Sequence, residues 1–378
     1  MLLQLPVVFI TVAIYTYEPR RTPWWADRCE CLPMDCTDKD KLTVVLLLAD
    51  KKLRQLAELV ESTCEQSDEV RYVQVNGNDS QHMADFESVL AQGNPNRCVV
   101  VLHKAAYDLL ARHRDVAAAA RWEMLQRMPP SMPLDPVDRT LCFADRASIC
   151  CALKHLAPLV QQPRYAELRG SLDDVMGAIT ELNFPLLCKP FDACGSDGHH
   201  LRLVLREEGL SELFLDGDRS SSTLKRPLIA QEFVDHGGLV IKGYAIGDFS
   251  HLTIKRSLPD LSTLYATDEG PAIMDLDSQS LLAGAFKGAS DVVTNEDTHA
   301  ATLLSRTRHE AEEVLNAIRL HMGVQLLGID MILGTNGQLL VVDANHFSST
   351  PHSVPGFRSA LTALLRSRIQ EVAHAGAN

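Results

Sequence analysis

The pattern of apolar and polar residues after position 41 predicts strands that alternate with helices. Short apolar runs that end at polar or turn residues are typical of buried strands, whereas apolar residues spaced three and four apart are typical of helices. By these rules Leu42 to Leu48, Arg71 to Val75 and Cys98 to Leu102 are predicted strands, and residues 50–60 and Met83 to Leu90 are predicted helices. Helical crossovers favour a parallel sheet, so residues 42–145 are expected to form an N-terminal α/β subdomain.

Shorter β-rich segments dominate the middle of the chain. Two helical patterns come first, at Arg146 to Ala157 and, after a capping serine, at Leu172 to Leu182, and a strand from Pro185 to Lys189 follows. Four more predicted strands are separated by Gly or Asp turns, and they are Leu201 to Leu205, Leu228 to Val234, Leu239 to Ile246 and His251 to Lys255. This pattern favours an antiparallel sheet, with Gly237 and Gly238 in one hairpin.

The last part of the chain begins with a polar segment. Pro259 to Thr298 contains glycine and is weakly periodic, which predicts a long surface loop. Behind it the sequence predicts a helix at Ala300 to His321, a strand pair at Leu326 to Leu333 and Gln338 to Val342, and a closing helix at Val354 to Val372. We expect a central subdomain at residues 146–250 and a C-terminal one at residues 251–378.

The amino-acid composition limits the classes of protein to which this chain can belong. The chain has 378 residues, of which 46% are apolar and 22% are charged, as expected of a soluble globular protein with two or three subdomains. The formal net charge of -13 disfavours a nucleic-acid binder, so any polyanionic substrate must meet a local basic pocket. The ten cysteines lie mostly inside apolar runs, which indicates reduced thiols and a cytoplasmic protein.

The N-terminal extension, residues 1–41, stands apart from this pattern. Its apolar stretch from Met1 to Tyr15 lacks a preceding basic region, contains Pro6 and is shorter than the roughly 20 residues that span a bilayer. A poorly ordered or mis-assigned tail, a signal or anchor segment and a docked strand all remain open. We expect a poorly ordered extension, and a monomer with no membrane partner.

Two acids near the C-terminus lie in strands where an ionised carboxylate needs a partner. Asp330 interrupts the run Gly328 to Met331, and Asp343 follows two valines and precedes Asn345 by two positions. Magnesium prefers hard oxygen ligands, so these three side chains make a plausible magnesium site. The alternative is that Asp330 pairs with an arginine and Asp343 caps a turn.

A phosphate-binding segment is predicted upstream of the two acids. Lys189 ends an apolar strand, and its point charge suits ATP phosphates, although a lysine at a strand end can also extend to solvent. Small residues follow in Asp192 to His200, which lets backbone N–H groups approach an anion. The chain lacks G-x-x-x-x-G-K-[ST] and the protein-kinase motifs, so those folds are disfavoured.

A third candidate is the strand from Leu228 to Val234, which carries polar groups near its end and could present backbone donors and acceptors to adenine. Lys242 lies on the following strand between apolar residues. A half-buried lysine there needs an anion nearby, unless the side chain faces outward to solvent.

Taken together, these stretches resemble the inositol 1,3,4-trisphosphate 5/6-kinase family, also called inositol-tetrakisphosphate 1-kinases. The resemblance rests on FPLLCKPFDACGSDGHH, LIAQEFVDHGGLVIKGYAIGD, KRSLPDL and LLGIDMIL followed by VVDANHF, and it extends from about Leu42 to the C-terminus. It implies an α/β ATP-grasp fold in which an N-terminal parallel α/β subdomain accompanies two subdomains that clasp ATP. It also implies ATP as co-substrate and Mg²⁺, with two ions expected.

The resemblance gives roles to residues of the central and C-terminal parts. Lys189 looks like the family's ATP-phosphate lysine, and Lys242 closes the adenine-lining segment on the inositol phosphate side. His199 matches the histidine that contacts inositol phosphates, with His200 as the alternative. The other implied ATP contacts are Gln231, Glu232, Phe233, Val234, Ser257 and, as a weaker match, Ser290. The implied metal ligands are again Asp330, Asp343 and Asn345, and Asn345 would also touch substrate.

The N-terminal subdomain adds further implied contacts. Lys52 resembles a lysine that touches substrate phosphate, and His103-Lys104 matches a family His-Lys pair. Asp135-Pro136 followed by Arg146 matches a stretch whose arginine contacts ATP.

One stretch departs from the family pattern. After D-x-N the family usually has an aromatic or small residue and then Phe-Pro-Gly, whereas this chain has His346-Phe347-Ser348-Ser349. Ser349 stands where a glycine would contact substrate, so the position of the substrate and the hydroxyl that reacts are open. An ATP-grasp carboxylate-amine ligase and a catalytically inactive nucleotide-binding scaffold remain the alternatives to a kinase.

Overall fold

A computed structural model describes residues 42–49, 52–53, 70–75, 77–91, 99–193, 200–214, 227–261, 270–277, 298–347 and 354–375. The chain divides into the units Met1–Asp38 and Lys39–Asn378, and every described residue belongs to the second unit. The N-terminal extension predicted at residues 1–41 therefore lies outside the described residues. No helix within the described ranges is both long and apolar enough to cross a membrane.

The N-terminal sheet is parallel, as predicted. Its three strands are β1 (Leu42–Leu47), β2 (Val70–Gln74) and β3 (Val99–His103), in the order β2-β1-β3. The described helices of this region include α2 (Ser80–Ala91), α3 (Ala105–Ala111) and α4 (Val116–Arg127), and of the helix predicted at residues 50–60 only the helical Lys52 and Leu53 are described. Side chains alternate along β1, so Val45 and Leu47 pack with Trp122 and Met124 of α4, while Val44 and Leu46 join a second cluster with Tyr244 and Phe347.

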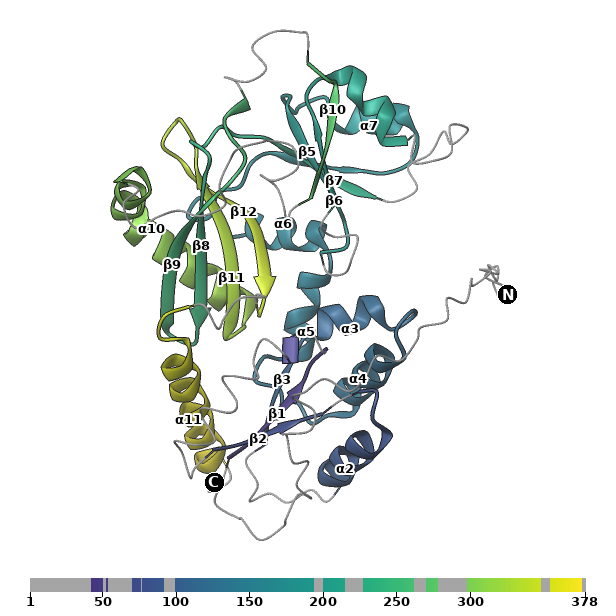
Figure 1. Cartoon of the computed structure of the whole chain (residues 1–378), viewed down its shortest axis with the longest axis vertical. Coiled ribbons are helices and arrows are strands. Elements are labelled where there is room, and N and C mark those ends of the chain that lie inside the picture. The colour runs from purple at the N-terminus through teal and green to yellow at the C-terminus, as the bar shows by residue number, and fades with distance from the viewer. Residues whose placement is uncertain are drawn as a thin grey trace, which may run out of the picture. The chain divides into compact units, whose positions relative to one another are not determined.

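The connection to the second sheet runs through α5 (Val137–Thr140), the 3-10 helix η1 (Leu141–Ala144) and α6 (Arg146–Lys154). The second sheet has five antiparallel strands in the order β10-β6-β5-β7-β4. Their bounds are β4 (Tyr165–Leu168), β5 (Leu186–Pro190), β6 (His200–Val204), β7 (Leu228–Glu232) and β10 (Ile273–Asp277). Helix α7 (Leu172–Ala178) and η3 (Glu207–Phe214) pack on it (Figure 1), and Ser171 caps α7 as predicted.

The third sheet holds the predicted metal residues. Its order is β12-β11-β8-β9, from strands β8 (Leu239–Ile246), β9 (Phe249–Arg256), β11 (Leu326–Leu333) and β12 (Leu339–His346). The 25-residue helix α10 (Thr298–Met322) covers β8 and β9 with apolar residues such as Leu315 and Ile318 (Figure 1). Helix α11 (Phe357–Ala375) packs against β8 and the cluster around Phe347.

Two predictions about the middle of the chain were wrong. The strands expected in one antiparallel sheet lie in two sheets, with β6 and β7 in the second and β8 and β9 in the third. Gly237 and Gly238, both at φ 67°, therefore join two sheets instead of turning a hairpin, and the hairpin of β8 and β9 turns at Gly247. The prediction pairs strands that are neighbours in the sequence, whereas β7 pairs with β5 and β4 and not with β8.

The predicted loop from Pro259 to Thr298 contains strand β10, which pairs with β6. Since β10 returns to the second sheet after β8 and β9 have formed part of the third, the chain crosses between the sheets more than once. The subdomain limits at residues 145 and 250 stay a proposal.

Candidate active site

One face of the third sheet gathers the predicted metal residues and a lysine. In the strand register Asp330 of β11 lies opposite Lys242 of β8 on one side and opposite Asp343 of β12 on the other. Asn345 lies two residues beyond Asp343, so its side chain points to the same face. We call Lys242, Asp330, Asp343 and Asn345 the acid face.

Hydrogen bonds hold these side chains in place. Lys242 Nζ lies 2.6 Å from Asp330 Oδ2, so Asp330 pairs with a lysine and not with the arginine of the alternative reading. Asp343 accepts from the backbone N–H of Ala344 at 3.0 Å and from Asn345 Nδ2 at 3.1 Å. Because Asn345 turns its amide nitrogen to Asp343, its amide oxygen is the atom that it can offer to a cation.

The electrostatics of the acid face favour an additional cation. Burial raises the pKa of Asp330, the Lys242 ammonium opposes this, and the Asp343 carboxylate adds to the rise. Burial alone would lower the pKa of Lys242, but the charge and hydrogen bond of Asp330, together with Tyr244 and Asp343, outweigh it and the pKa is raised. Two carboxylates that lie side by side on one partly exposed face, with the Asp343 carboxylate disfavouring the ionisation of Asp330, form a suitable setting for a divalent cation.

The donor set fits magnesium with the help of a nucleotide. Within the described residues no group of three or more His, Cys, Asp or Glu side chains is arranged for a metal ion. Two carboxylates and an amide oxygen are hard ligands, and magnesium commonly completes its shell with phosphate oxygens and water. These residues therefore suit a magnesium ion that arrives with ATP phosphates.

Lys189 connects the acid face to the second sheet. Its ammonium donates to Gln231 Oε1 at 2.7 Å and to the carbonyl of Val342 at 2.9 Å, which joins β5 and β7 to β12. The side chain is buried, and burial lowers its pKa, whereas the nearby Asp343 carboxylate raises it. Lys189 thus lies beside the acid face and not at a solvent-exposed strand end, and its contact with ATP phosphates stays a prediction.

A small pocket opens next to Lys189. Its lining includes Arg146, Lys189, Gln231 and Asp343, which are four of the predicted site residues, and the side chains of Cys150 and Gln162, which the sequence did not indicate. Neither of these two belongs to a motif or a polar pattern in the sequence. Cys150 lies on α6, while Gln162 follows the bridge between Gln161 and Leu340 of β12 and donates to the carbonyl of Cys150 at 2.8 Å. Burial raises the pKa of Cys150 to about 11, so it is a thiol and not a thiolate at neutral pH.

Arg146 supports the end of β5. Its Nη1 donates to the carbonyls of Pro190 at 2.6 Å and Asp192 at 2.9 Å, and its backbone N–H donates to Phe191 at 2.9 Å. The arginine therefore holds the segment that carries Lys189 while it lines the pocket itself.

The predicted adenine segment is only partly available for a base. The Glu232 carboxylate binds Arg164 at 2.6 Å, and the backbone N–H of Phe233 donates to Pro185 at 2.8 Å. The carbonyl of Val234 accepts from His236 Nδ1 at 2.7 Å, and His236 Nε2 lies 2.9 Å from the hydroxyl of Ser257. Since a carbonyl only accepts, Nδ1 carries the proton, and Nε2 accepts from Ser257; burial lowers the pKa of His236 and favours this neutral ring.

The predicted substrate lysines of the N-terminal region lie together. Lys52 is buried, with its ammonium 4.2 Å from the centre of the Phe347 ring. Burial and the neighbouring Lys104 ammonium lower the pKa of Lys52 to about 6. We call Lys52 and Lys104 the N-terminal lysine pair. Three other predicted residues, His199, Ser290 and Ser349, lie outside the described residues, while the alternative His200 begins β6 with an exposed side chain.

Comparison with known proteins agrees with this architecture. A family model described as the inositol 1,3,4-trisphosphate 5/6-kinase ATP-grasp domain matches residues 158–367, more than half of the 378 residues. Inositol-tetrakisphosphate 1-kinase 1 of Arabidopsis thaliana is 28% identical over 210 residues, which cover 52% of this chain and 58% of that protein. Inositol-tetrakisphosphate 1-kinase 6 of Oryza sativa subsp. indica is 31% identical over 280 residues, which cover 72% of this chain and 44% of that protein.

Among solved structures, a D-alanine–D-alanine ligase from Bacillus anthracis superposes with a TM-score of 0.51 at 11% identity, covering 89% of this chain and 99% of that one. At this identity the likeness concerns the fold. With the family match it confirms the predicted α/β ATP-grasp fold. The chain spans about half the length of the first curated relatives that it matches, at 58% and 44%.

Proposed function

Because the chain belongs to the inositol 1,3,4-trisphosphate 5/6-kinase family of ATP-grasp proteins, we propose that it transfers the γ-phosphoryl group of ATP to a ring hydroxyl of an inositol polyphosphate. The proposed acceptors are inositol 1,3,4-trisphosphate, at position 5 or 6, and an inositol tetrakisphosphate, at position 1. The observation that carries the proposal is the placement of the acid face directly beside Lys189 and its pocket.

ATP would bind at the pocket beside Lys189. Lys189 would offer its charge to the phosphates, Arg146 keeps the end of β5 in place, and Ser257 and the segment from Gln231 to Val234 would contact the base. Magnesium held by Asp330, Asp343 and the amide oxygen of Asn345, as one or two ions, would neutralise charge on the transferring phosphates. Phosphoryl transfer through a loose transition state depends mainly on such positioning and charge neutralisation, so no obligatory general base is assigned.

The acceptor would lie between the acid face and the N-terminal lysine pair. Lys104 and Lys242, together with Lys52 once a phosphate beside it favours its ammonium form, would supply the local positive charge that an inositol polyphosphate requires, because the chain as a whole has a net charge of -13. His199 and Ser349 complete the proposed acceptor site. That the protein is a cytoplasmic monomer stays a prediction, which the elution volume of the purified chain and its localisation in cells would test.

One assay tests the proposal. The purified chain is incubated with ATP, magnesium and each member of a panel of inositol tris- and tetrakisphosphates, and the products are resolved by anion-exchange chromatography. We expect one added phosphate on at least one acceptor and no product when EDTA replaces magnesium. ATP consumption that needs a carboxylate and an amine would indicate a ligase instead, and nucleotide binding without turnover on any acceptor would indicate an inactive scaffold.

A further inference from the structure

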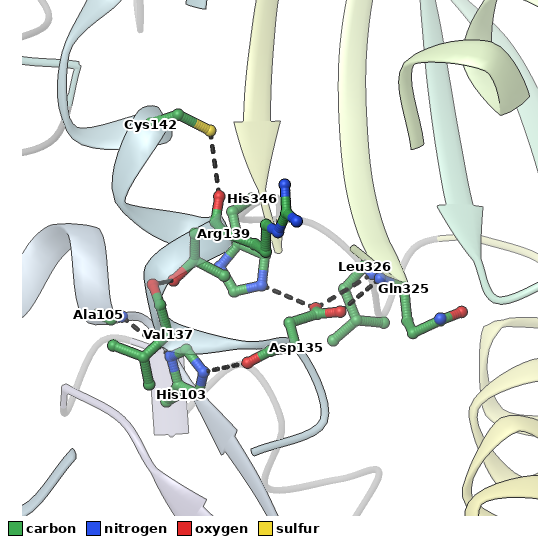
Figure 2. Close-up of polar contacts among 10 residues, drawn as sticks. His103, Ala105, Asp135, Val137, Arg139, Cys142, Gln325, Leu326 and His346 are labelled. Carbon is green, nitrogen blue, oxygen red and sulfur yellow. Dashed lines mark hydrogen bonds and ion pairs between the residues drawn. The ribbon is translucent and has the colours of Figure 1, made fainter. Parts of the chain in front are cut away.

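A buried aspartate joins the N-terminal region to the strands of the acid face. Asp135 is 2% exposed, and its carboxylate accepts the backbone N–H groups of Gln325 and, at 3.2 Å, of Leu326, where β11 begins. The same carboxylate lies 2.8 Å from His346 Nε2 at the end of β12, and the carbonyl of Asp135 lies 2.8 Å from His103 Nε2 at the end of β3. Figure 2 shows these four contacts converging on one residue, which we call the Asp135 joint.

Asp135 uses its carboxylate differently from two other described aspartates that precede helices. Asp115 and Asp145 precede α4 and α6 and cap them by accepting backbone N–H groups at 2.9 Å to 3.3 Å. Asp135 also precedes a helix, but Pro136 is the N-cap of α5 and makes no side-chain cap bond. The carboxylate of Asp135 is instead directed to strands that follow about 190 and 211 residues later in the chain.

His346 lies on the opposite side of β12 from the acid face. Successive side chains of a strand alternate, so His346 points away from the face that carries Asp343 and Asn345. Its ring is 3% exposed and packs beside Phe143 and His103, with ring centres 5.9 Å and 5.7 Å away. Its Nδ1 is buried without a hydrogen-bond partner among the described residues, so the bond to Asp135 is the polar contact that orients the ring.

The two neighbours of His346 in the chain connect to different halves of the proposed acceptor site, one to the acid face and the other to the N-terminal lysine pair. Asn345, just before it, is a member of the acid face, and Phe347, just after it, carries the Lys52 ammonium on its ring at 4.2 Å. Apolar packing around Phe347 also connects these regions, but it is not directional, whereas hydrogen bonds fix both distance and angle. The Asp135 joint therefore holds the end of β12, which carries Asn345 and Phe347, in a fixed position relative to β3 and the start of β11.

We propose that Asp135 and His346 are positioning residues for phosphoryl transfer, which hold the acid face at the correct distance from the N-terminal lysine pair. The proposal rests on the proposed function, because it concerns the geometry of that reaction. Neither side chain is expected to touch ATP, magnesium or the acceptor, since His346 faces away from them and Asp135 lies behind it.

Two substitutions of His346 separate positioning from packing. His346→Phe keeps an aromatic ring but removes the donor to Asp135, whereas His346→Gln places an amide N–H near the position of Nε2. We expect His346→Phe to lower kcat about ten- to hundredfold and to raise KM for the inositol phosphate, because misplacement of about 1 Å has effects of this size. The Kd for the ATP analogue AMP-PNP should change less than about twofold, and His346→Gln should recover kcat to within about fivefold of wild type.

A matched control distinguishes the joint from general loss of stability. Asp108 is 1% exposed and binds Arg121 at 2.7 Å and 2.9 Å inside the N-terminal region, so Asp108→Asn removes the charge from an equally buried carboxylate contact that does not reach β12. It should lower Tm and leave kcat per folded molecule unchanged. Hydrogen exchange should quicken at Gln325 and Leu326 in His346→Phe but not in Asp108→Asn.

The outcomes separate the two proposals. If wild-type protein phosphorylates no inositol phosphate, the proposed function is wrong. If wild type is active and His346→Phe keeps its kcat, or His346→Gln is impaired as strongly as His346→Phe, the positioning role is wrong and the proposed function stands. A loss of kcat in Asp108→Asn as large as that in His346→Phe would also overturn the positioning role.

Discussion

The acid face and the N-terminal lysine pair place the same type of side chain in opposite electrostatic settings. Lys242 has the Asp330 carboxylate 2.6 Å away, and the resulting pKa is raised despite burial. Lys52 lies over the Phe347 ring beside Lys104, and burial with that second ammonium lowers its pKa to about 6. Lys242 therefore keeps its charge before any ligand binds. The ammonium form of Lys52, in contrast, is stabilised only when an anion binds beside it.

The depressed pKa of Lys52 has a defined sign in the stability of the protein. Between about pH 6 and 10.5 the unfolded chain binds a proton at this lysine that the folded chain lacks. The free energy of unfolding contributed by Lys52 therefore rises with pH across this window and is at its lowest below pH 6. A phosphate bound beside Lys52 favours the ammonium, so acceptor binding at neutral pH should take up a proton.

Loss of a carboxylate from the acid face should have the largest effect. Asp343→Ala removes a proposed metal ligand that also accepts from Asn345, and we expect kcat to fall about a thousandfold or more, with several kcal/mol of transition-state stabilisation lost. The measurement is the rate of inositol phosphate phosphorylation at saturating magnesium. Asp275→Asn, on an exposed aspartate paired with Arg202, is the control and should keep its rate. Near-normal turnover in Asp343→Ala would remove the acid face from the mechanism.

Removal of the lysine between the two sheets should have the next largest effect. Lys189→Met deletes the ammonium bonded to Gln231 and Val342, and we expect AMP-PNP to bind about ten- to a hundredfold more weakly, as for the loss of a charge-assisted hydrogen bond. Titration calorimetry provides the Kd. Lys154→Met, on the exposed side of α6, is the matched control. Equal nucleotide affinity in the two variants would argue against a phosphate contact at Lys189.

Loss of Lys52 should have the smallest effect on the reaction. Lys52→Met should raise KM for the inositol phosphate about tenfold and leave the Kd for AMP-PNP unchanged, since one charge contact to the acceptor is lost. Calorimetric titrations at pH 7.5 in two buffers of different ionisation enthalpy measure proton uptake.

Lys52→Arg is the matched variant for this titration, because arginine stays charged and binding should then proceed without uptake at this position. Uptake that is the same in wild type, Lys52→Arg and Lys52→Met would show that Lys52 is already charged before the acceptor binds.

The local pattern of apolar residues predicted many of the strands. Strands β1, β3, β8 and β11 consist mainly of apolar residues that are buried along most of their length, so the apolar pattern marks them even though Lys242 and Asp330 interrupt it. Pairing is a property of distant segments, and for that reason β10 and the separation of β7 from β8 escaped prediction. Two glycines in a row indicate a turn but do not determine which strands it joins.

The candidate site likewise contains residues that the sequence reveals and contacts that it does not reveal. Acids that interrupt apolar strands are visible in sequence because their burial requires a partner, and Asp330 and Asp343 do lie side by side. That Lys242 neutralises Asp330, or that Asp135 is bonded to His346, depends on contacts across 88 and 211 residues. No local rule distinguishes an aspartate that caps its own helix from one that serves another sheet.

The two hydrogen bonds of Lys189 have a consequence for the entropy of nucleotide binding. A flexible lysine loses roughly 2 kcal/mol of rotamer freedom when it is fixed in one conformation. Here Gln231 and the Val342 carbonyl fix Lys189 before any phosphate is present, so that loss occurs when the chain folds. An ammonium has three N–H groups, and the third can donate to a phosphate oxygen without reorganisation of the side chain. ATP would therefore meet a cation whose conformational freedom has already been removed.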